Sequence, residues 1–232
     1  MSSTTPLSMR DPARIKPVPW DSAAFGFDCY EIIDPDPAVV GAAIAQPGHY
    51  TAKVDPLADK RFLHDAGFYY CDTLIEPWCT PDKLAHFEHP DVTFTRDVPL
   101  EPVAAICRTA FLHGRFHRDF NIERSRADRR YENWLAQLHA EGRVLGLLFK
   151  GEVAGFIGHL NGALVLHAMG DAHRGRGLAK FFWSAVCRDL FAQGQPEIRS
   201  SISFVNIAVI NLYSALGFRF RKPVDIYHRM VS

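Results

Sequence analysis

A short stretch near the carboxyl end of the chain joins residue types that bind anions. An apolar run ends at Met169, a turn follows in which arginines alternate with glycines, and a helical pattern begins at Leu178. Glycines let a backbone approach a ligand closely, and the free N–H groups at a helix start attract negative charge. The spacing is too short for a nucleotide P-loop and lacks the third glycine of a dinucleotide fingerprint. We therefore expect a pyrophosphate site formed by Arg174, Gly175, Arg176, Gly177, Leu178 and Ala179.

A second group of residues follows at helical spacing. Asn206 stands where a helix N-cap is expected, and Gly217 stands where a C-cap glycine belongs. Tyr213 comes seven positions after Asn206 (213 − 206 = 7), about two helical turns, so both side chains lie on one side of the helix. A phenol with an ordinary pKa of about 10 is close enough to a thiol at about 8.5 to protonate a departing thiolate. Tyr213 is therefore a candidate acid for acyl transfer, and the alternative is a tyrosine that only packs in the core.

The pattern around these residues predicts the elements that position them. Three strands form an antiparallel meander whose second turn is the hairpin signal Asn161-Gly162. A helical crossover then places a fourth strand parallel to the third. Alternation along the third strand leaves open which way His167 points. The predicted strands are 144–149, 153–160, 163–169 and 198–204, and the predicted helices are 103–112, 125–140, 178–192 and 207–218.

The N-terminal half contains a weak echo of this arrangement. The segment Phe62–Phe68 has a helical pattern that ends in Gly-Phe and is followed by a strand, as does Leu212–Phe218. No glycine-rich loop precedes the first copy. Further signals are a loop entering a strand at 20–33, a short helix at 38–45 and strands at 50–54 and 69–75. Prolines at 77, 81, 90 and 99 indicate a linker. We predict an N-terminal α/β domain over 1–90 and a second domain over 91–232.

Composition limits the class of protein. Apolar residues make up 47% of the 232 residues, and 26 basic side chains balance 26 acidic ones, which is ordinary for a globular chain and disfavours a nucleic-acid binder. The five scattered cysteines show no CxxC pair, so we expect reduced thiols, no disulfide framework and no metal site. The amino terminus lacks the pattern of a signal peptide and no apolar run could span a bilayer. We expect a cytoplasmic protein without a membrane partner.

The two motifs in this order, Arg-Gly-x-Gly-x-Ala opening a helix and then Asn followed by Leu-Tyr and Gly-Phe, resemble the GCN5-related N-acetyltransferase (GNAT) superfamily over roughly residues 100–232. The resemblance implies an α/β fold with a mixed, mostly antiparallel sheet flanked by helices. It also implies acetyl-CoA as the donor, with its pyrophosphate on Arg174–Ala179 and its pantetheine and thioester on the backbone of Ala168 and Met169. Asn206 would contact the cofactor arm, and Tyr213 would protonate the CoA thiolate.

A more diffuse likeness covers the N-terminal half as well. Trp20-Asp-Ser-Ala-Ala-Phe25-Gly26, Tyr50-Thr-Ala-Lys53-Val and Ala66-Gly67-Phe68 are similar to the dTDP-fucosamine acetyltransferases, amino-sugar nucleotide N-acetyltransferases that pair a degenerate GNAT-like half with a catalytic domain. This likeness implies an amino-sugar nucleotide as the small-molecule acceptor and a role in polysaccharide assembly. The likeness does not decide the oligomeric state, and a homodimer is one of the alternatives.

The acceptor residues are harder to identify from the sequence. A polar loop between two predicted helices offers arginines for phosphates and carboxylate or amide groups for sugar hydroxyls, although a solvated loop would look the same. Glu123, His159 or a water chain could deprotonate the amine. Rival functions are acetylation of another amine, such as a lysine, a protein N-terminus or an antibiotic, and non-catalytic acyl-CoA binding. The candidate acceptor-binding residues are Arg115, His117, Asp119, Asn121 and His159.

Overall fold

The computed structural model describes residues 14–112 and 114–232. The amino-terminal residues 1–13, where we expect no signal peptide, lie outside the described part. The chain divides into two compact units, Met1–Asp72 with Val224–Ser232 and Thr73–Pro223. We predicted a single division at residues 90 and 91. The structure differs because two long strands, β4 (Tyr69–Cys79) and β11 (Arg219–Val231), each begin in one unit and end in the other.

The first unit is a small α/β structure. Strand β2 pairs with β1 antiparallel and with β3 parallel, and α2 makes the crossover between β2 and β3. The end of β11 pairs with β3 antiparallel, from Asp225 opposite Val54 to Val231 opposite Gly48. Its elements are β1 (Ile15–Pro17), α1 (Pro19–Phe25), β2 (Cys29–Ile32), α2 (Pro37–Ala43), β3 (Gly48–Val54) and α3 (Arg61–Asp65).

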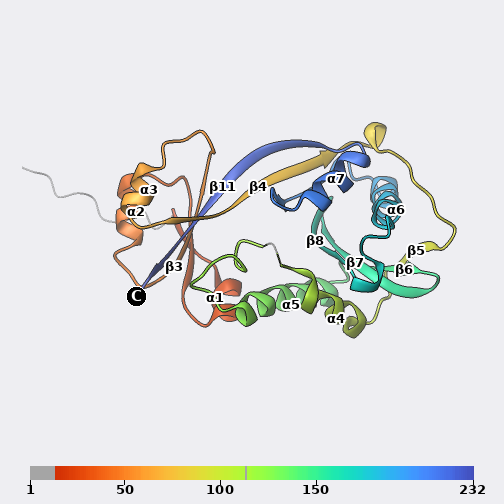
Figure 1. Cartoon of the computed structure of the whole chain (residues 1–232), viewed down its shortest axis with the longest axis horizontal. Coiled ribbons are helices and arrows are strands. Elements are labelled where there is room, and N and C mark those ends of the chain that lie inside the picture. The colour runs from red at the N-terminus through yellow and green to blue at the C-terminus, as the bar shows by residue number, and fades with distance from the viewer. Residues whose placement is uncertain (1–13, 113) are drawn as a thin grey trace, which may run out of the picture. The chain divides into compact units, whose positions relative to one another are not determined.

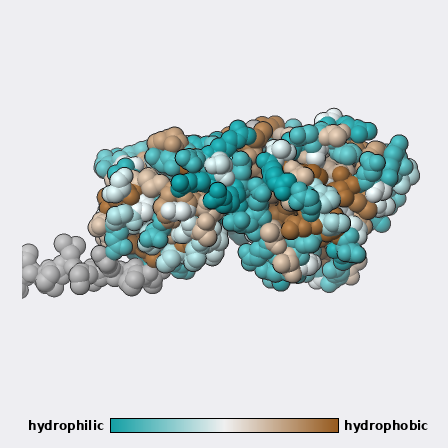
Figure 2. Space-filling view, turned by 90° about the horizontal axis from the view of Figure 1, so that it is seen from below, coloured by the Kyte–Doolittle hydropathy of each residue, from teal (hydrophilic) through white to brown (hydrophobic). Residues whose placement is uncertain are grey.

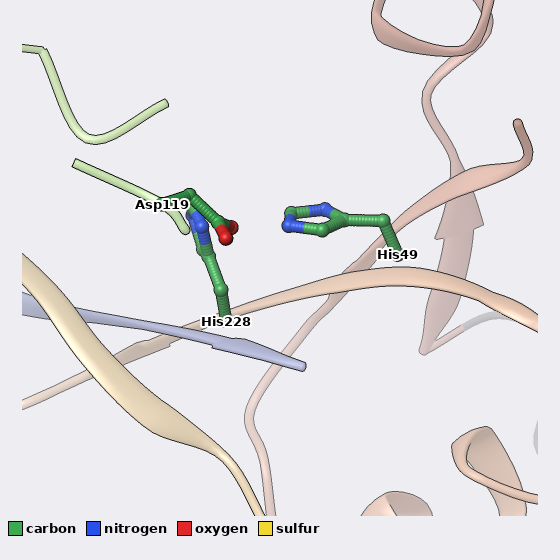
Figure 3. A group of neighbouring side chains, drawn as sticks. All are labelled: His49, Asp119 and His228. Atoms are coloured by element: carbon green, nitrogen blue, oxygen red, sulfur yellow. The ribbon is translucent and has the colours of Figure 1, made fainter. Parts of the chain in front are cut away.

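Helix α1 was not expected, since we predicted a loop at its position. Pro19 stands in its first turn, where a missing N–H costs nothing, and Gly26 ends it in the left-handed conformation at φ 77°. The core of this unit packs Ile32, Tyr50 and Leu63 with their neighbours. It also buries two histidine side chains from adjacent strands, His49 on β3 and His228 on β11, whose rings meet edge to face with centroids 4.7 Å apart (Figure 3).

The second unit contains the predicted meander and crossover. Strands β5 to β8 pair antiparallel in sequence order, and β8 pairs with β9 in parallel after α6. Asn161 and Gly162 both have positive φ, 46° and 74°, as a two-residue hairpin turn requires. The elements are β5 (Val92–Thr95), α4 (Leu100–Ala110), α5 (Arg124–Ala140), β6 (Val144–Phe149), β7 (Glu152–Leu160), β8 (Ala163–Met169), α6 (Ala179–Ala192), β9 (Ile198–Ser200), β10 (Ile202–Ser203) and α7 (Ile207–Ala215), with short 3₁₀ turns η1 (Pro81–Lys83) and η2 (Asp171–His173).

Two sequence predictions need correction in this unit. The segment predicted as a linker contains β5, an edge strand that pairs with β6 from Val92 opposite Phe149. The single strand predicted over 198–204 is two short strands that both pair with β4 in one antiparallel register, Arg199 lying opposite Trp78 and Ile202 opposite Ile75. The first error arises because an edge strand is set by a distant partner rather than by local periodicity.

The sheet of the second unit is covered on both faces (Figure 1). Helices α4 and α5 pack on one face, against Phe156 and Leu166, while α6 and α7 pack on the other, against Ile157 and Leu164. The predicted mixed, mostly antiparallel sheet flanked by helices is thus confirmed. The surface on the α4 and α5 side is mostly hydrophilic, with hydrophobic residues among the polar ones (Figure 2).

The two halves of the sequence share one local structure. Gly67 after α3 and Gly217 after α7 both adopt positive φ, 76° and 85°. In each case the next phenylalanine N–H donates back into the helix, from Phe68 to Leu63 at 2.8 Å and from Phe218 to the carbonyl of Tyr213 at 3.0 Å. A long strand follows each time, so the echo seen in the sequence corresponds to a repeated helix–glycine–strand unit.

Candidate active site

The turn between β8 and α6 presents a row of unused backbone donors. Gly175 and Gly177 both have φ 70°, and a Cβ atom at either glycine would meet nothing within 4 Å. Among the described residues, no acceptor receives the backbone N–H groups of residues 175–179. Leu178, at the N-cap of α6, provides no side-chain cap. The free N–H groups and the positive end of the helix dipole make an open cradle that suits an anion.

The two arginines of this turn have different surroundings. The Arg174 Nε donates to the Met169 carbonyl at 2.8 Å, and its guanidinium also pairs with Asp171 at 2.7 Å. Arg174 therefore holds the turn against the end of β8. Arg176 is exposed, lies 5.3 Å from the centroid of the Phe149 ring and donates only to the Ala172 carbonyl, at 3.3 Å. Arg176 is thus the arginine whose charge is more available to a ligand in the cradle.

The first unit has no such cradle at the matching place. Helix α2 follows β2 as α6 follows β8, but the Asp36 side chain caps it and accepts from the N–H groups of Ala38 and Val39, both at 2.9 Å. These backbone hydrogen bonds, together with Arg14, lower the pKa of Asp36. A carboxylate of the chain itself therefore occupies the position where an anionic ligand would bind, which supports the view of this half as degenerate.

Strands β8 and β9 separate soon after they meet. They pair only at Ala163 with Arg199 and at Leu164 with Ser200, whereas β8 stays paired with β7 as far as Met169. The Ser200 hydroxyl donates to the Leu164 carbonyl at 2.7 Å and closes the junction of the two strands. From residue 165 onward, the described structure places no strand on the β9 side of β8. This opened edge includes Ala168 and Met169, which the sequence assigned to the cofactor arm.

Tyr213 reaches this junction from α7. Its side chain is fully buried, and its hydroxyl lies 3.1 Å from Nε2 of His167 on β8. The His167 ring also meets the Trp183 ring edge to face at 5.2 Å. Sequence reasoning selected Tyr213 but not its contacts with His167 and Trp183, since these come from three elements with no shared spacing.

Burial has the largest effect on the pKa values of His167 and Tyr213. It lowers the pKa of His167 to about 4 and raises the pKa of Tyr213 above the ordinary phenol value, against the opposing effect of Ser200 and Trp183. The same cause raises the pKa of the neighbouring Cys187 thiol. His167 is therefore neutral and Tyr213 protonated throughout the physiological pH range.

Asn206 forms the N-cap of α7, as the sequence predicted. Its side-chain oxygen accepts from the Val209 N–H at 3.4 Å, a long hydrogen bond. The residues on either side of Asn206 are apolar and exposed: Phe204, Val205 and Ile207 have exposed fractions of 51%, 47% and 56%. The start of α7 thus carries a capping amide within an exposed apolar surface.

The predicted acceptor loop forms a compact group with α5. The guanidiniums of Arg115 and Arg130 lie 4.6 and 4.8 Å from the centroid of the Phe116 ring. His117 is held at 2.9 Å by Asp128. The buried Asp119 accepts from the Asn121 N–H at 2.8 Å, while Asn121 itself is exposed.

His159 lies elsewhere. It is near the hairpin end of β7, where burial lowers its pKa, Arg143 and Arg96 lower it further, and Asp189 acts against them. The structure therefore brings Arg115, His117, Asp119 and Asn121 together and places His159 in a different charged environment. Glu123, the other candidate base, is exposed at the start of α5 and pairs with Arg126 at 3.5 Å.

No helix in the described part of the chain is both long and apolar enough to cross a membrane.

Comparison with known proteins agrees with this geometry. Residues 109–218 match the acetyltransferase (GNAT) family. This part of the chain is therefore similar to the GNAT family, whose members use acetyl-CoA. No curated protein is similar enough to the chain to match it.

Solved structures show the same fold at low sequence identity. A GCN5-related N-acetyltransferase from Sphaerobacter thermophilus is 14% identical with a TM-score of 0.59, over 80% of this chain and 60% of its own, so this chain spans less than two thirds of that protein. A tandem GNAT protein from the clavulanic acid biosynthesis pathway is 12% identical with a TM-score of 0.53, over 88% and 75%. A GCN5-related N-acetyltransferase from Kribbella flavida is 14% identical with a TM-score of 0.55, over 87% and 80%. The match to the tandem protein is consistent with a GNAT-like fold in the N-terminal half of this chain.

The partly buried His167 predicts a specific dependence of stability on pH. Its folded pKa of about 4 lies below the unfolded value of 6.5, so its contribution is fully present above pH 6.5 and is lost as the pH falls toward 4. The loss should amount to about 3 kcal/mol. The measurement is urea unfolding of the wild type, His167→Gln and His86→Gln between pH 4 and 7. His167→Gln should flatten the profile, and the exposed His86→Gln should not; equal profiles for all three proteins would contradict the assignment.

Proposed function

We propose that this chain, whose residues 109–218 match the acetyltransferase (GNAT) family, transfers acetyl directly from acetyl-CoA to the amine of an amino-sugar nucleotide of the dTDP-amino-dideoxyhexose type. The observation that carries the proposal is the arrangement around β8. An uncapped helix N-terminus lies after one end of the strand, and a buried tyrosine hydroxyl lies beside the opened edge.

The donor fits this arrangement by its chemistry. A pyrophosphate matches the free N–H groups of residues 175–179, with Arg176 adding charge. The amides of the pantetheine arm suit the opened edge of β8 at Ala168 and Met169, where a ligand can hydrogen-bond to strand backbone as another strand would. The arm would pass Asn206 and bring the thioester toward Tyr213.

The chemical step needs an acid at the sulfur. The amine nitrogen attacks the thioester carbonyl and forms the C–N bond, and the C–S bond then breaks with its electron pair on sulfur. Tyr213 gives its phenolic proton to that thiolate, and the proton lost by the amine restores the phenol. Burial raises the pKa of Tyr213, but desolvation raises a thiol pKa as well, as at Cys187. The difference between donor and acceptor pKa therefore stays small enough for the transfer.

The acceptor assignment rests on the loop at 115–121 and on α5. Arg115 and Arg130 flank the Phe116 ring, and Arg130 also lies over Tyr131 and Trp134 at 5.4 Å from each centroid. Guanidinium groups beside aromatic faces suit a ligand that joins a planar base to a diphosphate. A nucleotide-linked amine has both parts, whereas a lysine or a polyamine has neither.

The cradle can be tested with a matched pair of glycine variants. Gly177 and Gly194 both have positive φ and open space around them, but Gly177 lies at the start of α6 and Gly194 follows its end. Gly177→Ala should weaken acetyl-CoA binding at least about tenfold because it disturbs the donor N–H groups, whereas Gly194→Ala should leave it unchanged. Both should lose a similar amount of stability, about 1 kcal/mol. Calorimetric titration measures the Kd, and equal affinities would remove the cradle from the donor site.

Tyr213→Phe tests the acid. We expect kcat to fall by about 10² or more while the Kd for acetyl-CoA stays within about twofold, because the acid acts only in the transition state. Tyr50→Phe is the control, since Tyr50 is equally buried and donates to the Gln46 carbonyl at 3.1 Å in the first unit. Thiol release reports kcat. A Tyr213→Phe protein as active as Tyr50→Phe would show that another group protonates the thiolate.

The acceptor class is decided by a panel of amines in the same thiol-release assay. We expect kcat/KM for dTDP-linked amino-dideoxyhexoses to exceed that for the free amino sugars by about 10² or more, since charge-assisted contacts to the diphosphate contribute about 1.5–3 kcal/mol each. Arg115→Ala should reduce this preference, and Arg108→Ala, whose guanidinium pairs with Glu101 on α4, should not. If a lysine peptide, a polyamine or an aminoglycoside reacts faster than the dTDP-linked amino sugars, that class of amine would replace the amino-sugar nucleotide as the proposed acceptor. Acetyl-CoA binding without turnover of any amine would indicate a binding protein.

A further inference from the structure

The contact between Tyr213 and His167 lies inside the candidate active site without a role in the chemistry so far described. The two atoms, Tyr213 Oη and His167 Nε2, are 3.1 Å apart, and Tyr213 has no exposed surface. His167 meets both the Trp183 and the Tyr213 rings edge to face, with centroids 5.2 and 6.1 Å away. A largely desolvated polar contact of this kind restricts the geometry of the groups that share it.

An irregularity in β8 places His167 there. Gly158 pairs with Leu166 and His159 with Leu164, so Val165 is an extra residue in β8 at a bulge. Leu164 packs on the α6 side, whereas Val165 and Leu166 both belong to the core on the α4 and α5 side. The next residue, His167, therefore returns to the α6 and α7 side, where Tyr213 is.

The tautomer of His167 decides which group donates in this contact. Nε2 faces the Tyr213 hydroxyl at 3.1 Å, so Nδ1 is the other ring nitrogen that can carry the proton. In the neutral ring with its proton on Nδ1, Nε2 has a lone pair and accepts a hydrogen bond from the phenol of Tyr213. This is the tautomer that the proposal requires.

Ser200 and Trp183 also lie close enough to lower the pKa of Tyr213 against the effect of burial. Ser200 gives its own proton to the Leu164 carbonyl at 2.7 Å, and the buried Trp183 N–H reaches no partner at hydrogen-bond distance within the described residues. The hydrogen-bond partner that the described structure gives the Tyr213 hydroxyl is therefore Nε2 of His167.

We propose that His167 is the positioning residue of Tyr213, which deepens the proposed function and rests on the role of Tyr213 as acid. In the resting protein the phenolic proton lies on the Tyr213–His167 hydrogen bond. When the C–S bond breaks, that O–H bond breaks, the S–H bond forms, and His167 stays neutral. The Nε2 lone pair then faces a tyrosinate oxygen and repels it, so the proton from the amine returns to Tyr213 rather than leaving to solvent.

The test combines a spectroscopic readout with a pair of variants. Nitrogen-15 NMR of the full chain, labelled at histidine, should show His167 neutral with its proton on Nδ1, and Tyr213→Phe should move the Nε2 resonance toward that of a free imidazole. A protonated Nε2, or a resonance that Tyr213→Phe leaves unchanged, would overturn the proposal. This readout needs neither donor nor acceptor, so it stays decisive if the amino-sugar assignment fails.

The variants His167→Gln and His167→Leu separate positioning from packing. Glutamine keeps a hydrogen-bond acceptor on a side chain that can reach toward the Nε2 position, whereas leucine fills the space without one. His167→Leu should lower kcat by about 10–100-fold through misplacement of the hydroxyl, with the Kd for acetyl-CoA unchanged. His167→Gln should recover most of that loss. Equal kcat values for the two variants would show that His167 only packs; should His167→Leu fail to fold, the NMR comparison of the wild type with Tyr213→Phe decides.

Discussion

The candidate active site depends on how little β8 and β9 are paired. Two residue pairs, ending at Leu164 and Ser200, join β8 to β9, whose other neighbour is β4. Because the pairing stops there, the rest of β8 has an open edge with unsatisfied backbone groups, which a ligand with amides can pair. Near this junction the phenol of Tyr213 lies 3.1 Å from Nε2 of His167 on β8. A longer ladder would stabilise the sheet and close the site.

The two halves of the chain show what distinguishes a binding cradle from a structural cap. Both have a strand, a short connection and a helix that leads to a parallel strand. In the first unit the Asp36 carboxylate accepts hydrogen bonds from the N–H groups at the start of α2, so these groups are not available to a ligand. In the second unit glycines replace capping residues and the N–H groups of residues 175–179 stay available. An uncapped helix start is unfavourable in the free protein, and an anion that binds there removes the cost.

Burial sets the chemistry of the second unit as much as residue type does. His167 and Tyr213 would titrate near pH 6.5 and pH 10 in water, but desolvation moves the two pKa values apart, so both groups stay neutral over a wide range. A neutral pair can share one proton without a net charge in the core, and charge appears only when the thiolate leaves. The acceptor loop, by contrast, contains permanently charged groups: the guanidiniums of Arg115 and Arg130 lie against the Phe116 ring.

The sequence by itself determined the parts that local rules control. Glycine and arginine spacing predicted the open turn before α6, Asn161-Gly162 predicted the hairpin, and helical periodicity placed Asn206 at the cap of α7 and Tyr213 two turns later. Tertiary structure decided the rest. The bulge at Val165 turns His167 toward Tyr213, which no alternation rule could foresee because a single extra residue reverses the side of every residue after it. The long strands β4 and β11 cross from one unit to the other, and β5 forms inside the expected linker, because strand partners are chosen by contacts far apart in the sequence. Pattern and spacing therefore selected the residues that we propose for the donor site, and the pairing of distant strands decided which of them meet.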